Sequence, residues 1–250
     1  MKEKIINWLN EYKETTKAKG VVLGISGGKD STVVAMLSKL VFGDEVLGVI
    51  MPNGIQKDID DAITVCEILH INYRIVNIND AYRGLLDATG LASLEISDKS
   101  KTNIPPRLRM TTLYAVAQTL GYRVIGTGNA SERYIGWCTK FGDMACDLNP
   151  IAHLTCFEVV KLGYELMLED YPELEEDFYI KYLAKLPADG LTGKTDEDNF
   201  GFTYLDLTNY MTTGTSGKLE IDEKIKTLHT ISEHKLKMPY TLLEPGKLIN

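Results

Sequence analysis

The feature that most constrains the fold is a short apolar run that ends at a pair of glycines and continues as a helical pattern. Residues 21–25 (Val-Val-Leu-Gly-Ile) are mostly β-branched or apolar, which predicts a buried strand. Gly27 and Gly28 follow, and after Asp30 the apolar residues recur at helical spacing. The sequence therefore predicts a strand, a tight glycine turn and a helix.

A glycine turn in front of a helix is suited to bind phosphate. Glycines let the backbone bend sharply and bring several N–H groups close to an anion. The helix adds its free N-terminal N–H groups and the positive end of its dipole. The turn is not a Walker A loop, because Gly28-Lys29 is followed by Asp30. It is not a dinucleotide fingerprint either, because Gly24 is followed by Ile-Ser-Gly rather than by x-Gly-x-x-Gly.

The hexapeptide Ser-Gly-Gly-Lys-Asp-Ser at residues 26–31 resembles the pyrophosphate loop of the N-type ATP pyrophosphatases. Those enzymes cleave ATP between the α and β phosphates, adenylylate a substrate oxygen, and let a nitrogen or sulfur nucleophile displace AMP. Backbone N–H groups would hold the departing pyrophosphate, and Asp30 would offer Mg²⁺ a hard oxygen ligand. The alternative is an ordinary strand–turn–helix without a ligand, which the complete hexapeptide disfavours.

Further strand patterns alternate with helical patterns along the first half of the chain. The strands are expected at residues 45–51, at 73–78 and from 124 onward. This alternation predicts right-handed crossovers and a doubly wound parallel α/β sheet. Extra C-terminal helices are expected over 204–237. Ligands of such sheets bind outside the carboxyl ends of the strands, where the glycine turn lies.

Length, charge and cysteine content limit the class of protein. The chain has 250 residues and a net charge of −8, which suits one α/β domain and argues against a nonspecific nucleic-acid binder. It has neither a membrane-spanning apolar run nor the apolar core of a signal peptide, so we expect a cytoplasmic protein. Its cysteines match neither a disulfide framework nor a common zinc spacing: Cys66, Cys138, Cys146 and Cys156.

A second candidate anion site lies before the fourth strand. Residues 103–110 (Asn-Ile-Pro-Pro-Arg-Leu-Arg-Met) run into a helical pattern, and the prolines predict an extended entry and a first helical turn there. The polar stretch 93–101 in front of them predicts an exposed loop. Arg107 and Arg109 would lie in the first turn, where the helix dipole disfavours cations. This position fits a solvated surface and an anionic ligand equally well.

Three later segments are candidates for function. Glu132 follows the glycine-bounded loop 126–128. If the first and fourth strands are neighbours, it would give Mg²⁺ a second carboxylate. Considered alone, it fits an ordinary surface glutamate. Residues 136–151 follow neither a helical nor a strand period, and irregular loops of this kind often carry function. Residues 187–197 are punctuated by glycine and proline, which indicates a lid.

Taken together, the motifs resemble those of one family, the ammonia-dependent NAD synthetases. The similarity runs in unbroken order from about residue 5 to 239. Its motifs are residues 24–31, 103–109, 126–132, 139–143, 147–150, 195–197 and 234–235. The Thr-Lys-Phe-Gly-Asp element at 139–143 and the His-Lys element at 234–235 separate this family from GMP synthetase and argininosuccinate synthetase. The resemblance implies an adenine nucleotide α-hydrolase-like, Rossmann-like fold.

The resemblance also implies a reaction and a set of site residues. The reaction is the ATP- and Mg²⁺-dependent amidation of deamido-NAD with ammonia, through an adenylylated nicotinate, to NAD, AMP and pyrophosphate. The implied ATP ligands are Gly24, Ile25, Ser26, Gly27, Gly28, Lys29, Asp30, Ser31 and Thr127. The implied Mg²⁺ ligands are Asp30 and Glu132. The implied deamido-NAD contacts are Arg107, Lys140, Asp147, His234 and Lys235, and the implied catalytic residues are Asp30, Lys140 and Asp143, the last near the ammonia entry.

The family also implies a homodimer and a single synthetase domain over residues 1–250, without a glutaminase domain. Two positions depart from its pattern: Cys156 stands where the family has a phosphate-binding lysine, and Ala188 where it has a hydroxyl residue. We expect Lys29 or Lys194 to supply the missing cation. The alternatives are another adenylating amide ligase of the same superfamily and a catalytically impaired nucleotide-binding paralogue. The presence of both Asp30 and Glu132 favours an enzyme.

Overall fold

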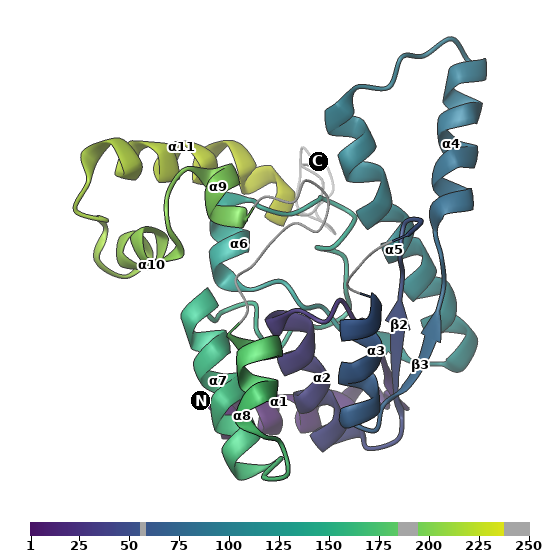
Figure 1. Ribbon diagram of the computed structural model, residues 1–250, viewed down its shortest axis with the longest axis vertical. Helices are drawn as coiled ribbons and strands as arrows, with labels where there is room; N and C mark the ends of the chain where they lie inside the picture. Colours follow the sequence, from purple (N-terminus) through teal and green to yellow (C-terminus); the bar gives the residue numbers. More distant parts are fainter. Residues whose placement is uncertain (56–58, 185–194, 238–250) are drawn as a thin grey trace, which may run out of the picture.

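The computed structural model describes residues 1–55, 59–184 and 195–237. A four-stranded parallel sheet in the order β3-β2-β1-β4 lies at its centre, with helices on both faces (Figure 1). The strands are β1 (Val21–Gly24), β2 (Val46–Ile50), β3 (Asn72–Ile75) and β4 (Arg123–Val124). The predicted doubly wound α/β fold is thereby confirmed, and β1 and β4 are neighbours.

The helices follow the predicted alternation through β3 and then continue beyond β4. Their bounds are α1 Lys2–Thr16, α2 Lys29–Phe42, α3 Ile59–Ile68, α4 Asn79–Leu91, α5 Asp98–Leu120, α6 Ala130–Ile135, α7 Cys156–Glu169, α8 Glu176–Phe178, η1 Tyr179–Leu183, α9 Asp196–Phe200, α10 Tyr204–Thr213 and α11 Leu219–Leu236. None of the helices in the described ranges combines the length and apolar character needed to cross a bilayer.

The main hydrophobic core lies between the sheet and α2, which runs directly from the glycine turn. Leu23 of β1, Leu37 of α2 and Leu166 of α7 are fully buried in this core. A smaller core on the opposite face of the sheet contains Val22, Val49 and Ala117, the last from α5. Burial on both faces explains why β1 and β2 are almost continuously apolar. Helix α2 begins just beyond the carboxyl end of β1.

The entry to α5 differs from the prediction. Pro105 and Pro106 do not begin this helix but lie inside it, because the helix begins at Asp98, after Ser97. The Ser97 side chain accepts a hydrogen bond from the backbone N–H of Ser100 and so stabilises an earlier start. Residues 98–101 are therefore helical, although exposed. The two arginines that follow the prolines consequently lie in the middle of the helix and not in its first turn.

The C-terminal helices form a separate small cluster beside the sheet domain. Helices α10 and α11 pack with α6 around Phe200, Leu207 and Ile225, and Figure 1 shows them apart from the sheet. The prediction of additional helices over 204–237 is confirmed. Helix α11 contacts α6 closely, so the segment after β4 connects this cluster to the sheet edge where the glycine turn lies.

Candidate active site

The turn between β1 and α2 is held by its own hydroxyl groups. Ser31 Oγ and Thr32 Oγ1 donate to the carbonyl oxygen of Gly28 at 3.1 and 2.9 Å. The backbone N–H of Gly28 donates to Ser26 Oγ at 3.3 Å. Gly27 adopts a φ of 75°, the left-handed region that glycine enters without strain. These contacts form a rigid loop with the N-terminus of a 14-residue helix behind it, the arrangement that binds phosphate.

Asn129 joins the two predicted metal-binding carboxylates across the β1–β4 boundary. Its Nδ2 donates to Asp30 Oδ1 at 3.1 Å, and its backbone N–H donates to Glu132 Oε2 at 3.0 Å. Its Oδ1 accepts from the Glu132 backbone N–H, which completes a capping box at the start of α6. Asn129 is fully buried. The one signal in the sequence for this role is the spacing of Asn129 from Glu132, which is typical of a capping box.

The charges at this site compete with one another. Burial and, after it, the nearby Asp30 carboxylate raise the pKa of Glu132 to about 8, against the opposing effect of the Lys29 ammonium. Two carboxylates held this close suit a hard divalent cation, which would favour ionised Glu132. No cluster of three or more His, Cys, Asp or Glu side chains that could hold a metal occurs within the described residues. Any cation here would need further oxygen ligands from substrate or water.

Lys29, Cys156 and Asp196 complete the buried group. The Lys29 ammonium lies 2.5 Å from Asp30 Oδ2, and Cys156, the first residue of α7, is close enough to interact with it. Asp196 begins α9, is 4% exposed and accepts a hydrogen bond from the Tyr204 hydroxyl at 2.8 Å. Asp196 belongs to the motif at residues 195–197, whose pattern alone indicates no role for it. Its charge also acts on Glu132, so it belongs to the same electrostatic site.

Three predicted substrate contacts lie in a chain of hydrogen bonds outside this group. Arg107 Nε donates to the carbonyl oxygen of Lys140 at 3.3 Å. Lys140 Nζ donates to the carbonyl oxygen of His234 at 2.6 Å. The structure thus brings together α5, the 139–143 loop and the end of α11. Arg107 and Lys140 are cations, so this segment suits an anionic ligand.

Lys235 and Asp143 hold the loop that follows α6. Lys235 Nζ donates to the carbonyl oxygens of Gly136 and Cys138 at 2.7 and 2.9 Å. Asp143 Oδ1 accepts from the Thr139 backbone N–H at 2.8 Å. Burial raises the pKa of Asp143, and this hydrogen bond acts in the opposite direction. A carboxyl group with a raised pKa in a loop beside the site is a candidate proton acceptor.

Asp147 does not lie with these residues but at β4. Its Oδ2 accepts from the Val124 backbone N–H at 2.8 Å, and the Tyr114 hydroxyl lies 3.4 Å from its Oδ1. Thr127 lies in the short segment between Ile125 and Asn129, the N-cap residue of α6. Ile125 forms a parallel bridge with Leu148. Ala188 and Lys194 lie outside the described residues, as does the predicted lid up to residue 194.

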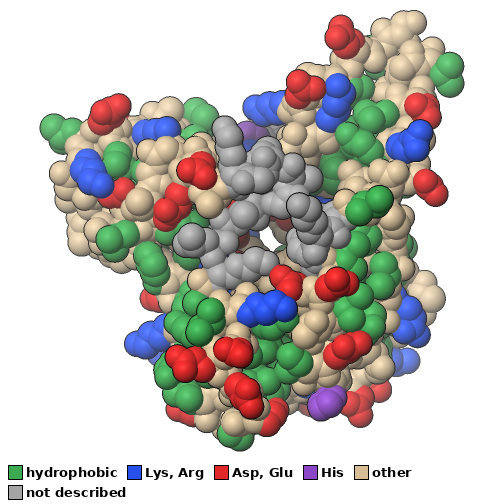
Figure 2. All heavy atoms as spheres, in the orientation of Figure 1, with side chains coloured by type: hydrophobic (Ala, Val, Ile, Leu, Met, Phe, Trp, Pro, Cys, Tyr) green, Lys and Arg blue, Asp and Glu red, His purple; other side chains and the backbone are tan. Residues whose placement is uncertain are grey.

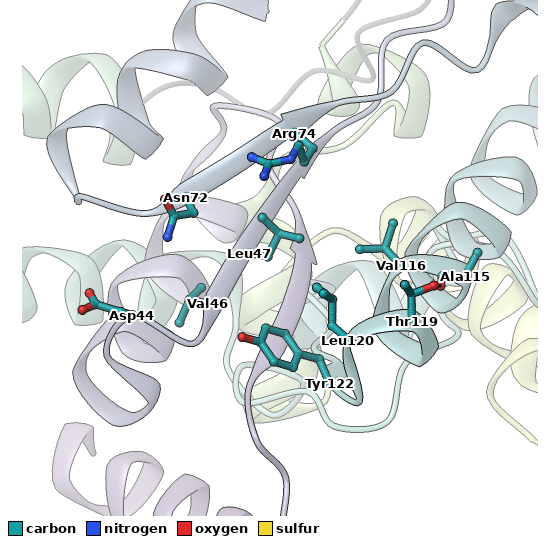
Figure 3. Close-up of a pocket in the computed structure, with 10 residues that line it drawn as sticks. All are labelled: Asp44, Val46, Leu47, Asn72, Arg74, Ala115, Val116, Thr119, Leu120 and Tyr122. Carbon is teal, nitrogen blue, oxygen red and sulfur yellow. The ribbon is translucent and has the colours of Figure 1, made fainter.

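A cavity of about 610 Å³ lies elsewhere in the molecule. It opens at the amino ends of the strands, where Val46, Asn72, Leu120 and Tyr122 line it (Figure 3). None of the predicted site residues contributes to it. Because ligands of doubly wound sheets bind at the carboxyl edge, the phosphate loop remains the candidate site.

A doubly wound sheet with a phosphate loop and paired carboxylates at its switch point defines a nucleotide-binding α/β protein. The comparisons specify it further: a family model described as NAD synthase matches residues 1–239, and the chain belongs to this family. The family resemblance predicted from the motifs is thereby confirmed.

Relatives of known name match along almost the whole chain. The NH(3)-dependent NAD(+) synthetase of Carboxydothermus hydrogenoformans is 41% identical, over 95% of this chain and 94% of the relative. Among solved structures, the NMN synthetase from Francisella tularensis has a TM-score of 0.83 at 35% identity, with 96% of each chain covered. The NH3-dependent NAD synthetase from Campylobacter jejuni has a TM-score of 0.74 at 30% identity, with 97% of each chain covered.

Proposed function

We propose that the chain amidates deamido-NAD with ammonia at the expense of ATP and yields NAD, AMP and pyrophosphate. The observation that carries this proposal is the placement of Asp30 and Glu132, joined by Asn129, beside a phosphate-binding loop. The relatives named NH(3)-dependent NAD(+) synthetase support the choice of substrates. We also propose that residues 1–250 act as one synthetase unit in the cytoplasm.

In the first step, a nicotinate carboxylate oxygen attacks the α-phosphorus of ATP and pyrophosphate leaves with the electrons of the broken P–O bond. The N–H groups of the loop and the N-terminus of α2 stabilise the charge on that pyrophosphate. Asp30 and Glu132 would hold Mg²⁺, because carboxylate oxygens are the ligands that this hard cation prefers. When bound, Mg²⁺ supplies positive charge that stabilises the phosphates.

In the second step, ammonia attacks the acyl carbon of the adenylylated nicotinate, and AMP leaves with the electrons of the C–O bond. The nitrogen then loses one proton. Asp143 is the proposed acceptor, because its raised pKa makes its carboxylate a better base than an exposed aspartate. Arg107 and Lys140 would bind the anionic substrate, since they lie in one hydrogen-bonded chain near this loop.

The direct test is NAD formation by the purified chain. With ATP, Mg²⁺, deamido-NAD and ammonium, we expect NAD, AMP and pyrophosphate in equal amounts. With glutamine in place of ammonium, NAD formation should not exceed the background measured without any nitrogen donor. If no NAD forms with ammonium, the proposed reaction is wrong. If glutamine supports the same rate as ammonium, the assignment of ammonia as the nitrogen donor is wrong.

A second candidate substrate is nicotinate mononucleotide. The observation in its favour is the TM-score of 0.83 to the Francisella tularensis NMN synthetase, against 0.74 to the Campylobacter jejuni NAD synthetase. The chemistry would be unchanged, because both substrates carry the same nicotinate carboxylate. Measuring kcat/KM for both substrates decides between them: we expect the higher value with deamido-NAD, and a higher value with the mononucleotide would reassign the function.

We further propose that the chain forms a homodimer through α4 and α5, which project from the sheet domain (Figure 1). Helix α4 has no buried residue, and Leu85, Leu91 and Leu94 are 42%, 89% and 60% exposed. Figure 2 shows hydrophobic side chains on this projection. A second copy that presents the same surface would bury them.

Sedimentation tests this dimer. We expect the wild-type chain to sediment as a dimer and the double variant Leu91→Glu/Leu94→Glu to sediment as a monomer, because two charges would have to be buried in the interface. Leu219→Glu, at an 86% exposed leucine that begins α11, is the matched control and should remain dimeric. A wild-type monomer at high concentration would refute the proposal.

A further inference from the structure

The ammonium of Lys29 is enclosed at the phosphate loop and does not extend into solvent. Lys29 is the first residue of α2, and its side chain is only 3% exposed. Lysine is almost never buried to this degree unless its ammonium is paired. The partner is Asp30, whose Oδ2 lies 2.5 Å from Nζ. The ion pair therefore occupies the same carboxylate that we assign to the divalent cation.

Two partners hold Asp30, and they differ in mobility. Asn129 donates to Oδ1 and is fixed by the capping box that ties it to Glu132. Lys29 contacts Oδ2 through a flexible four-carbon stem. A divalent cation that approaches Oδ2 would meet the ammonium at contact distance, where like charges repel strongly in a site with little water. Lys29 is therefore the partner that must leave.

An ammonium displaced inside this site needs a new anion. Cys156 is close to it, but a thiol is only a weak hydrogen-bond acceptor. Glu132 is also close, but it is the second carboxylate of the same metal site. Lys29 itself lies in the phosphate loop of residues 26–31, so phosphates bound by this loop would offer its ammonium a new anion. The backbone of Lys29 need not move, because its side chain alone can turn from Asp30 to a phosphate oxygen.

We propose that Lys29 is an internal counter-ion of the metal site. Its ammonium neutralises Asp30 while no divalent cation is bound, and it turns to phosphate oxygens once the cation and pyrophosphate bind. Lys29 thus acts first as a competitor of the metal and then as a positioning charge for the leaving group. The inference depends on the proposed function only for the identity of the anion as pyrophosphate.

Calorimetry on the complete chain separates the two roles of Lys29 without any turnover. Lys29→Met keeps the length of the side chain and removes its charge. In the absence of nucleotide, we expect Mn²⁺ to bind the variant about tenfold more tightly than wild type, since the competing cation is gone. At saturating Mn²⁺, we expect inorganic pyrophosphate to bind about tenfold more weakly, because a phosphate contact is lost.

The matched control is Lys39→Met, on the same helix but in an ion pair with Asp44. It should change neither affinity. Lys29→Met/Cys156→Lys tests the neighbouring position: it should restore part of the pyrophosphate affinity, because the new ammonium starts beside the one removed. If Lys29→Met does not fold, as judged by circular dichroism, Lys29→Gln replaces it.

The opposite signs of the two effects make the proposal refutable. Mn²⁺ binding that is unchanged or weaker in a folded Lys29 variant overturns the competition, and unchanged pyrophosphate binding overturns the second role. A merely structural Lys29 would weaken both ligands together, which also contradicts the proposal. Failure of the wild-type chain to make NAD would refute the proposed function and leave these binding differences unaffected.

Discussion

Asp30→Asn is expected to abolish turnover and to leave the fold intact. The substitution removes the negative charge of a carboxylate that faces Glu132 across Asn129 and keeps the size of the side chain. The Asn side chain retains an oxygen for the hydrogen bond from Asn129 Nδ2. The Mg²⁺ that would stabilise the phosphates depends on this carboxylate as a ligand. We therefore expect kcat to fall by about 10³-fold or more, which corresponds to roughly 4 kcal/mol of transition-state free energy.

Steady-state rates of pyrophosphate release measure this effect, and circular dichroism checks the fold. Asp44→Asn is the matched control, because Asp44 follows the other end of α2 and its side chain is 92% exposed. The control should keep the wild-type rate. A folded Asp30→Asn variant with a near-native rate would show that Asp30 is not a metal ligand.

Local patterns were sufficient to predict the architecture of the site. The strand–glycine–helix pattern at residues 21–42 depends on contacts close in sequence, and β1 and α2 form where the pattern placed them. The predicted role of Glu132 beside Asp30 depended on β1 and β4 being adjacent strands, which local patterns could not show. The parallel pairing of Val22 with Val124 satisfies that condition.

The remaining features depend on contacts between distant segments. The start of α5 was missed because the two prolines are stronger local signals than the cap at Ser97. The role of Asn129 requires knowing that its amide reaches Asp30, which lies 99 residues away in sequence. Asp147 stays a predicted substrate contact, and its motif gave no sign that its carboxylate accepts a hydrogen bond from the backbone of β4. Period and spacing cannot reveal such pairings.

Gly27→Ala is expected to impair both the loop and its ligand binding. Gly27 has a φ of 75°, which costs an alanine about 1 kcal/mol or more. An added Cβ would also lie 2.8 Å from Asp61 Cβ and 2.9 Å from the backbone nitrogen of Ala62, so α3 and the loop would have to move apart. We expect a loss of about 2–4 kcal/mol in the free energy of unfolding and a lower melting temperature.

Ligand binding should decrease more than stability alone explains, because the backbone N–H groups of the loop would no longer converge on one phosphate position. We expect inorganic pyrophosphate, measured by calorimetry with Mg²⁺ at a temperature where the variant is folded, to bind about 100-fold more weakly. Gly214→Ala separates the two causes: its φ is 86°, but no atom lies within 4 Å of an added Cβ. That control should show the conformational cost alone and retain wild-type pyrophosphate affinity. If Gly27→Ala behaves like Gly214→Ala in both measurements, the close approach of α3 does not shape the phosphate loop.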